Sequence, residues 1–93
     1  MSNFALILSN NARGFLSDLQ PKQFKQVGNR IFALARNEYP TDCKHLSGHP
    51  GFRRIDVGEF RVCYTVKDGA IQIVVVGRRN DDAAYRELDR VLG

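Results

Sequence analysis

The sequence predicts an α+β fold in a single domain that spans residues 1–93. Apolar residues recur at helical spacing over about residues 11–39, whereas over residues 52–77 they alternate at strand spacing. A length of 93 residues leaves room for one hydrophobic core. The apolar share of 43% is ordinary for a globular chain, which argues against a disordered tail.

The first half of the chain is typical of a strand followed by a helical hairpin. Residues 3–8 form a short apolar run that suits a strand, and the polar residues 9–11 can then cap a helix over about residues 11–19. Pro21 suits the first turn of a second helix, which we expect Pro40 and the residue before it to end. The apolar face of this second helix comprises Phe24, Val27, Ile31, Leu34 and Ala35.

The second half is typical of three strands joined by short turns. Residues 40–51 contain two prolines and two glycines and are predicted to form a loop. Strands are then expected over residues 52–57, 60–66 and 70–77. Consecutive hairpins make these three strands antiparallel to one another. The last strand is apolar on both faces, which is typical of an inner strand.

A final helix completes the predicted order β-α-α-β-β-β-α. Asn80, Asp81 and Asp82 can provide its N-cap and negative charge near its N-terminus. We expect an antiparallel sheet with the helical hairpin packed on one face, and with all helices on that face. The apolar side of the last helix would comprise Ala84, Leu88, Val91 and Leu92.

Alternation along the first two of these three strands sorts the charged side chains. Arg54, Asp56 and Arg61 fall on the face turned away from the core. The last strand ends in Arg78 and Arg79, and one of these two would join the same face. The pattern predicts a concave basic face opposite the helices. The alternative is a set of ordinary solvated arginines.

The charge distribution favours a polyanionic partner such as RNA or DNA. The net charge is +4, and residues 44–79 hold seven basic against three acidic side chains. An ordinary solvated surface with a modest excess of charge is the alternative. The apolar runs are too short to cross a bilayer, and no secretory signal is visible. We therefore expect a soluble, cytoplasmic protein without a membrane partner.

The cysteines and histidines do not match a standard metal site or a disulfide framework. Cys43, His45 and His49 form a C-x-H-x3-H pattern that lacks a fourth ligand at an obvious spacing. Cys63 is the second cysteine, and in a chain without an export signal we expect both thiols to stay reduced. The sequence therefore predicts neither a metal nor another cofactor.

Three stretches resemble one family of proteins. They are residues 44–51 (KHLSGHPG), 52–64 (FRRIDVGEFRVCY) and 76–85 (VGRRNDDAAY). Together they resemble the RelE/ParE superfamily, the toxins of bacterial type II toxin–antitoxin systems, and in particular its RelE-like mRNA interferases. The likeness covers nearly the whole chain and implies the RelE-like microbial RNase fold, which has the same order of elements.

The resemblance also implies an activity and its residues. RelE-type toxins cleave mRNA in the ribosomal A site, with the 2′-hydroxyl as nucleophile and no metal, whereas ParE-type toxins poison DNA gyrase without nuclease chemistry. Arg61, Arg79 and Tyr85 match the residues that the RelE pattern uses for cleavage. Arg54 matches the first of two basic residues in that pattern. Asp56 stands where the second would be, so the chain departs from the pattern there.

The chemistry assigns these residues different tasks. Arg54, Arg61 and Arg79 can stabilise the charge that develops on the phosphate, but arginine is a poor proton acceptor. Tyr85 could stack on a base or orient the 2′-hydroxyl, and core packing is its alternative role. The candidates for moving protons are Tyr85, Lys44, His45, His49 and Asp56.

Asp56 is the candidate with two clear alternatives. Its carboxylate could act as an acid or base, or it could form a salt bridge with Arg54 and Arg61, which we favour. Arg53 and Arg78 are expected to contact RNA rather than to take part in catalysis, and Lys44 is expected to bind RNA through a phosphate.

The leading hypothesis is a RelE-like endoribonuclease toxin that cleaves ribosome-bound mRNA and inhibits translation. Its partners would be a cognate antitoxin protein and the ribosome with its mRNA. The first alternative is a ParE-like inhibitor of DNA gyrase. The second is a catalytically dead relative that binds RNA or an antitoxin, which the aspartate at position 56 makes plausible.

Overall fold

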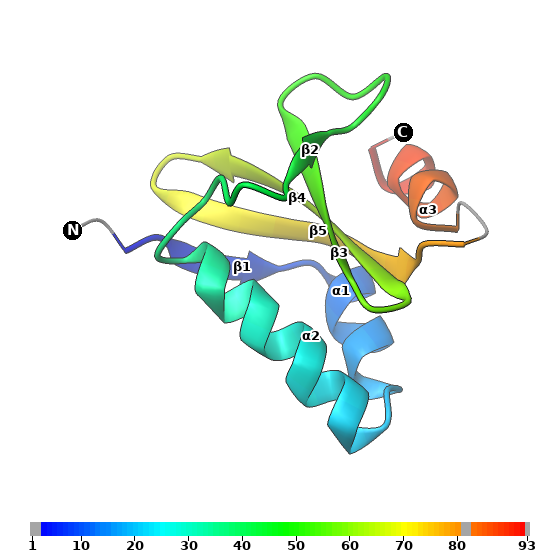
Figure 1. Cartoon of the computed structure of the whole chain (residues 1–93). Helices are drawn as coiled ribbons and strands as arrows, with labels where there is room; N and C mark the ends of the chain where they lie inside the picture. Colours follow the sequence, from blue (N-terminus) through cyan, green and yellow to red (C-terminus); the bar gives the residue numbers. More distant parts are fainter. Residues whose placement is uncertain (1–2, 81–82, 93) are drawn as a thin grey trace.

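A computed structural model describes residues 3–80 and 83–92 of the chain. Over these residues, five strands form one sheet in the order β1-β5-β4-β3-β2, and three helices pack against it (Figure 1). No helix within these ranges is long and apolar enough to cross a membrane. The elements are β1 (Ala5–Leu8), α1 (Asn10–Ser17), α2 (Pro21–Leu34), β2 (Lys44–His45), β3 (Phe52–Val57), β4 (Phe60–Lys67), β5 (Ala70–Arg78) and α3 (Ala83–Leu92).

The predicted order of elements is confirmed, with two differences in the sheet. Strands β3, β4 and β5 are antiparallel as expected, but β1 pairs with β5 in parallel, so the sheet is mixed. Strand β5 lies between β1 and β4 and is an inner strand, as its apolar faces predicted. The loop predicted over residues 40–51 contains the additional two-residue strand β2, which pairs with the edge of β3.

The helical hairpin begins where the sequence predicts. The Ser9 side chain accepts a hydrogen bond from the backbone N–H of Ala12, and Pro21 lies in the first turn of α2. Helix α2 ends at Leu34, several residues before the expected stop at Pro40. The carbonyl of Ala35, the residue that follows, accepts a hydrogen bond from the Phe4 backbone, so the chain there is tied to the N-terminal segment.

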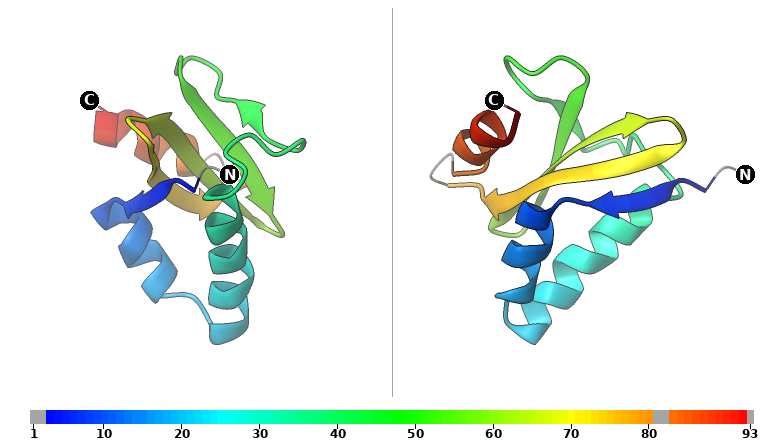
Figure 2. Two further views of the ribbon diagram at one scale, coloured as in Figure 1. Left: turned by 90° about the vertical axis from the view of Figure 1, so that its left-hand side faces the viewer. Right: turned by 180° about the vertical axis from the view of Figure 1, so that it is seen from behind.

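Helices cover both faces of the sheet, and the expectation that all lie on one face is wrong. Figure 2 shows α3 on one side of the sheet and the α1–α2 hairpin on the other. Two hydrophobic clusters match this arrangement: Val27 and Ile31 of α2 belong to the first, and Ala84 and Leu88 of α3 to the second. The other two residues of its predicted apolar side, Val91 and Leu92, are exposed. The acidic residues expected before α3 lie outside the described ranges.

An irregularity in β5 changes which residues face each cluster. Cys63 pairs with Val75 and Tyr64 with Ile73, so the register skips Val74. Strict alternation would place Ile73 and Val75 on one face, but Val75 packs with α3 while Ile73 packs with the hairpin. A bulge of this kind reverses the facing of every later residue in the strand.

Candidate active site

The turn between β3 and β4 sets Asp56 and Arg61 opposite each other. Gly58 adopts a positive φ of 59°, which glycine accepts readily, and Asp56 is the cross-strand partner of Arg61. Directly opposed residues of an antiparallel pair have side chains on the same face. The Nε of Arg61 donates a hydrogen bond to Oδ1 of Asp56 over 2.8 Å, and its Nη2 donates to Oδ2 over 3.4 Å.

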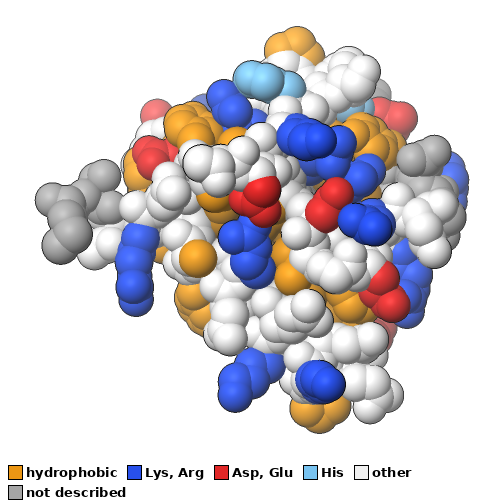
Figure 3. All heavy atoms as spheres, viewed as in Figure 1, with side chains coloured by type: hydrophobic (Ala, Val, Ile, Leu, Met, Phe, Trp, Pro, Cys, Tyr) orange, Lys and Arg blue, Asp and Glu red, His pale blue; other side chains and the backbone are white. Residues whose placement is uncertain are grey.

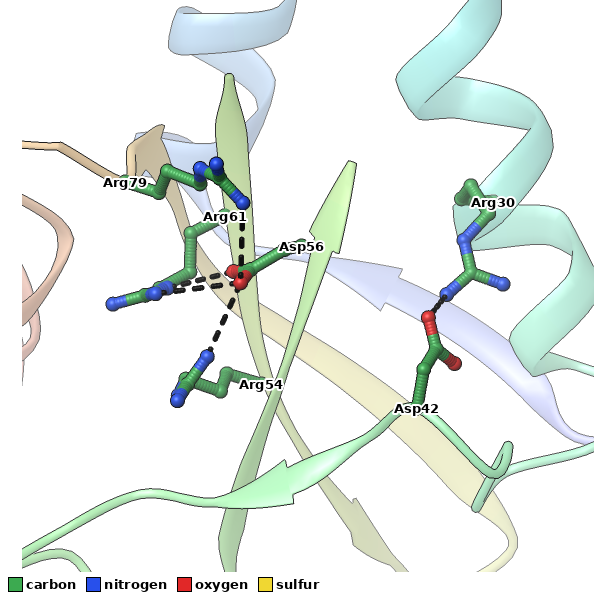
Figure 4. Close-up of polar contacts among 6 residues, drawn as sticks. All are labelled: Arg30, Asp42, Arg54, Asp56, Arg61 and Arg79. Carbon is green, nitrogen blue, oxygen red and sulfur yellow. Dashed lines mark hydrogen bonds and ion pairs between the residues drawn. The ribbon is translucent and has the colours of Figure 1, made fainter. Parts of the chain in front are cut away.

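Two further arginines reach the same carboxylate. Arg54 lies two residues before Asp56 on β3, and its Nη1 donates to Oδ2 of Asp56 over 3.3 Å. Arg79 follows β5, and its Nη1 lies 3.8 Å from the same oxygen. Figure 4 shows the three guanidinium groups converging on Asp56 from different directions. We call Arg54, Asp56, Arg61 and Arg79 the arginine cluster. In the space-filling view of Figure 3, basic side chains gather around acidic ones over β3 and β4.

The arginine cluster changes the pKa values of its own members. Burial raises the pKa of Asp56, but the hydrogen bond from Arg61 and the charges of Arg61, Arg54 and Arg79 outweigh it, so this pKa lies below its usual value. The hydrogen bond to Asp56 in turn raises the pKa of Arg61. Both side chains are therefore charged at neutral pH.

The position of Tyr85 is compatible with both of its predicted alternatives, packing in the core and a contact with RNA. Its half-buried ring packs against the hydrophobic cluster that contains Ala84 and Leu88 of α3. The guanidinium carbon of Arg61 lies 5.5 Å from the centre of that ring. A tyrosine in contact with the core thus borders the arginine cluster.

Arg78 and Arg79 point in different directions. Arg78 forms an ion pair with Glu59, and its guanidinium carbon lies 5.3 Å from the centre of the Phe60 ring. Phe60 belongs to the hairpin-side cluster and is the register partner of Arg78. Arg79 is therefore the arginine that joins Asp56, and Arg78 lies apart from the arginine cluster.

The predicted RNA contacts are divided between the two faces of the sheet. Lys44 is exposed on β2 directly opposite Arg54, on the face of the arginine cluster. Arg53 points the other way: its guanidinium carbon lies 4.2 Å from the centre of the Tyr39 ring, and its Nη1 donates to the sulfur of Cys43 over 3.7 Å. Of the three predicted RNA contacts, only Lys44 extends the cluster.

The residues of the C-x-H-x3-H pattern have other neighbours. Cys43 accepts the hydrogen bond from Arg53, His45 is exposed opposite Arg53, and Nε2 of His49 lies 2.9 Å from Oδ1 of Asp89. Over residues 3–80 and 83–92, no three His, Cys, Asp or Glu side chains lie close enough together to hold a metal ion.

Two polar contacts that the sequence did not reveal anchor α3. His49 holds Asp89, and Nδ2 of Asn11 donates to Oε2 of Glu87 over 2.9 Å. These pairs join the helix to the loop before β3 and to α1. Because the partners are far apart along the chain, no local pattern could have indicated them.

Comparisons with known proteins give structural matches only. No protein-family model matches the chain, and no curated protein sequence matches it. Among solved structures, a double arginine-to-alanine mutant of Escherichia coli toxin RelE in the free state is 18% identical, with a TM-score of 0.78, and the match covers 95% of this chain and 97% of that one.

Two further structures show the same similarity. The toxin–antitoxin complex RelBE2 from Mycobacterium tuberculosis has a chain 25% identical with a TM-score of 0.74, over 87% of this chain and 97% of that one. The YoeB dimer from Staphylococcus aureus is 20% identical with a TM-score of 0.69, over 84% and 99%. The chain therefore has the fold of the RelE-like toxins, as its resemblance to that family implied.

Proposed function

We propose that the chain is the toxin of a toxin–antitoxin system and that it acts as a RelE-like endoribonuclease on ribosome-bound mRNA. The observation that carries this proposal is the convergence of three arginines from β3, β4 and the end of β5 on one anion, with Tyr85 beside them. The similar fold of RelE structures supports the same reading.

Stabilisation of developing negative charge is often the largest contribution to catalysis, and this reaction develops such charge. The 2′-hydroxyl of the RNA loses its proton as its oxygen attacks the adjacent phosphorus. The bond from phosphorus to the 5′-oxygen breaks and that oxygen takes up a proton, so the products carry a 2′,3′-cyclic phosphate and a 5′-hydroxyl. Negative charge grows on the phosphorane and on the leaving oxygen. Guanidinium groups suit both, because their planar fork can hold two oxygens at once. Arg54, Arg61 and Arg79 would provide this charge.

Tyr85 and Lys44 would position the RNA around that phosphate. The Tyr85 ring can stack on a base turned out of the mRNA, since every base has an aromatic face. Lys44 can contact a neighbouring phosphate, because it is exposed directly opposite Arg54. The nucleophile belongs to the RNA, so the proposed mechanism requires no metal-activated water.

The partners follow from the same proposal. Several of the similar structures are RelE chains in complex with the antitoxin RelB. We infer a cognate antitoxin that covers or neutralises the basic face. The ribosome would present the mRNA to the arginine cluster. Such a toxin would act in the cytoplasm.

A brief expression experiment tests the activity. The chain is expressed without its antitoxin, and the 5′ ends of translated mRNAs are mapped. We expect codon-phased cuts that decrease about 100-fold or more in Arg61→Ala and Arg79→Ala, the range for loss of one transition-state donor. Arg30→Ala is the matched control, because Arg30 pairs with Asp42 away from the cluster (Figure 4).

The same experiment separates the alternatives. Intact mRNA together with accumulated gyrase–DNA cleavage complexes would replace the proposal with a ParE-like function. Intact mRNA, normal gyrase and continued growth would identify a catalytically dead relative. Thermal unfolding of each variant shows whether a loss of cutting reflects a loss of the folded state.

A further inference from the structure

The Asp56 carboxylate lies where the arginine cluster would hold a substrate phosphate. Guanidinium groups from three segments of the sheet contact this carboxylate, and Arg61 donates to it from two nitrogens. A carboxylate and a phosphodiester both present two oxygens to a guanidinium fork, so the same donors fit either group. The position that a phosphate needs is thus already filled by an anion of the chain itself.

The three arginines hold this carboxylate unequally. Arg61 has the shortest contact, 2.8 Å, and its side chain is 13% exposed. Arg54 lies at 3.3 Å and is 20% exposed. Arg79 lies at 3.8 Å and is 52% exposed, so it is the most accessible and least firmly bound of the three. The order of distances matches the order of exposure.

Arg54 also keeps an unused donor. Its Nε is buried and has no hydrogen-bond partner among the described residues. A buried donor without a partner costs free energy that a new acceptor would recover. Asp56 therefore does not satisfy all the donors of the arginines around it, and one negative charge against three positive charges leaves the cluster cationic.

We propose that Asp56 is a built-in counter-ion that competes with the substrate phosphate for the arginine cluster. When a phosphate binds, Arg79 and then Arg54 exchange the carboxylate for it, while Arg61 stays on Asp56 and contributes its charge from there. The nature of the substrate rests on the proposed function. Asp56 thereby weakens binding to polyanions in general and holds the arginines in place until an RNA is presented.

A binding experiment with an RNA that cannot be cleaved tests this role. The probe is a fluorescein-labelled single-stranded oligonucleotide with 2′-O-methyl groups, and its anisotropy is followed against the full chain over a range of salt concentrations. Asp56→Asn keeps the shape of the side chain but removes its charge. We expect it to bind about tenfold more tightly at low salt, with a steeper salt dependence, because an additional arginine becomes available to phosphate.

Asp42→Asn is the matched control. Asp42 has a similar ion pair with one arginine, Arg30, but its side chain is 56% exposed and away from the arginine cluster. The Asp42→Asn variant also loses one negative charge, so it reports the effect of net charge alone on RNA affinity. We expect this effect to be about twofold or less at moderate salt. Equal affinities of the two variants, or weaker binding by Asp56→Asn, would overturn the proposal.

A second measurement uses the unmodified protein, in case Asp56→Asn does not fold. Inorganic phosphate is titrated at constant ionic strength while NMR follows the arginine Nε–Hε signals. We expect the Arg79 and Arg54 signals to shift first and the Arg61 signal to change least. An Arg61 signal that responds first, or no response from any of the three, would contradict the exchange.

Neither measurement depends on RNA cleavage, so the two proposals can fail separately. Absence of mRNA cleavage together with tighter binding by Asp56→Asn would reject the enzymatic function and retain the counter-ion. Cleavage that depends on the arginines, with no gain in affinity for Asp56→Asn, would reject the counter-ion alone.

Discussion

The guanidinium carbon of Arg61 on β4 lies 5.5 Å from the centre of the Tyr85 ring on α3. A cation close to an aromatic ring is attracted to the ring's electron-rich face. This contact couples the charged groups of the sheet to a helix that packs on the same face through a separate hydrophobic cluster. The position of α3 therefore decides whether an aromatic ring borders the arginine cluster.

A large side chain at Gly77 should displace α3, whereas a small one should not. A Cβ at Gly77 would lie 3.4 Å from atoms of Ala84, which is ordinary contact, so we expect Gly77→Ala to fold and to cut mRNA normally. Gly77→Leu would push α3 away, with a loss of about 1–3 kcal/mol in the free energy of unfolding and at least a tenfold loss of cleavage. Urea unfolding and mapped mRNA ends measure the two effects.

Gly14→Leu is the control for this series. Gly14 lies on the exposed side of α1 with nothing within 4 Å of a Cβ. We expect it to leave cleavage unchanged. Normal cleavage by Gly77→Leu would show that the position of α3 does not matter for activity.

The ring of Tyr85 should matter for RNA affinity more than its hydroxyl does. Stacking on one base contributes about 1–3 kcal/mol, so Tyr85→Ala should weaken binding of an uncleavable single-stranded RNA by about 5- to 150-fold. Tyr85→Phe keeps the ring and should stay within about twofold of the original affinity. Fluorescence anisotropy measures both. An equal loss in the two variants would assign the contribution to the hydroxyl instead.

Asp56 should make stability depend on pH. The folded state lowers the pKa of this carboxyl, so its stabilising contribution is present above the ordinary pKa and is lost as the pH falls through the folded value. We expect Asp56→Asn to be less stable than the original chain by about 1 kcal/mol near pH 7, and the difference to disappear once the pH falls below the lowered pKa of the folded state. Urea unfolding followed by far-UV circular dichroism measures it. A difference that stays constant with pH would be evidence against an ionised, paired carboxylate.

The two cysteines should differ in reactivity. Cys63 is fully buried, and burial raises its pKa to about 11, although Arg61 and Arg54 act in the opposite direction. Cys43 is partly exposed. At about pH 8, iodoacetamide should therefore modify Cys43 and leave Cys63 intact, as measured by peptide mass spectrometry. Both should react in guanidinium chloride, and equal labelling in the folded state would contradict the burial of Cys63.

The boundaries of several elements could be predicted because their signals are local. Strand β3 was predicted over 52–57 and has those bounds, and Pro21 begins α2 as expected. Turn residues and caps act on their immediate neighbours, so a sequence displays them directly. The parallel pairing of β1 with β5 joins segments about 65 residues apart, so no local pattern shows that β1 is the neighbour of β5.

Strand alternation and the family resemblance together predicted part of the site. Alternation placed Arg54, Asp56 and Arg61 on one face, and their ion pairs confirm that placement. The helix on that face was missed. The apolar pattern of α3 shows that one side of it packs but does not show which face of the sheet receives it.

The sequence by itself determined the order of the elements, the strand face that carries three of the charged residues, and the resemblance to RelE-like toxins. Only the tertiary structure decided that Arg79, rather than Arg78, joins Asp56. Strict alternation from Ile73 would have turned Arg78 toward Arg61, but the register of β5 skips Val74 and reverses the facing of the residues that follow. Such a bulge depends on how β4 and β5 pair along their whole length, and that pairing exists only in the folded sheet.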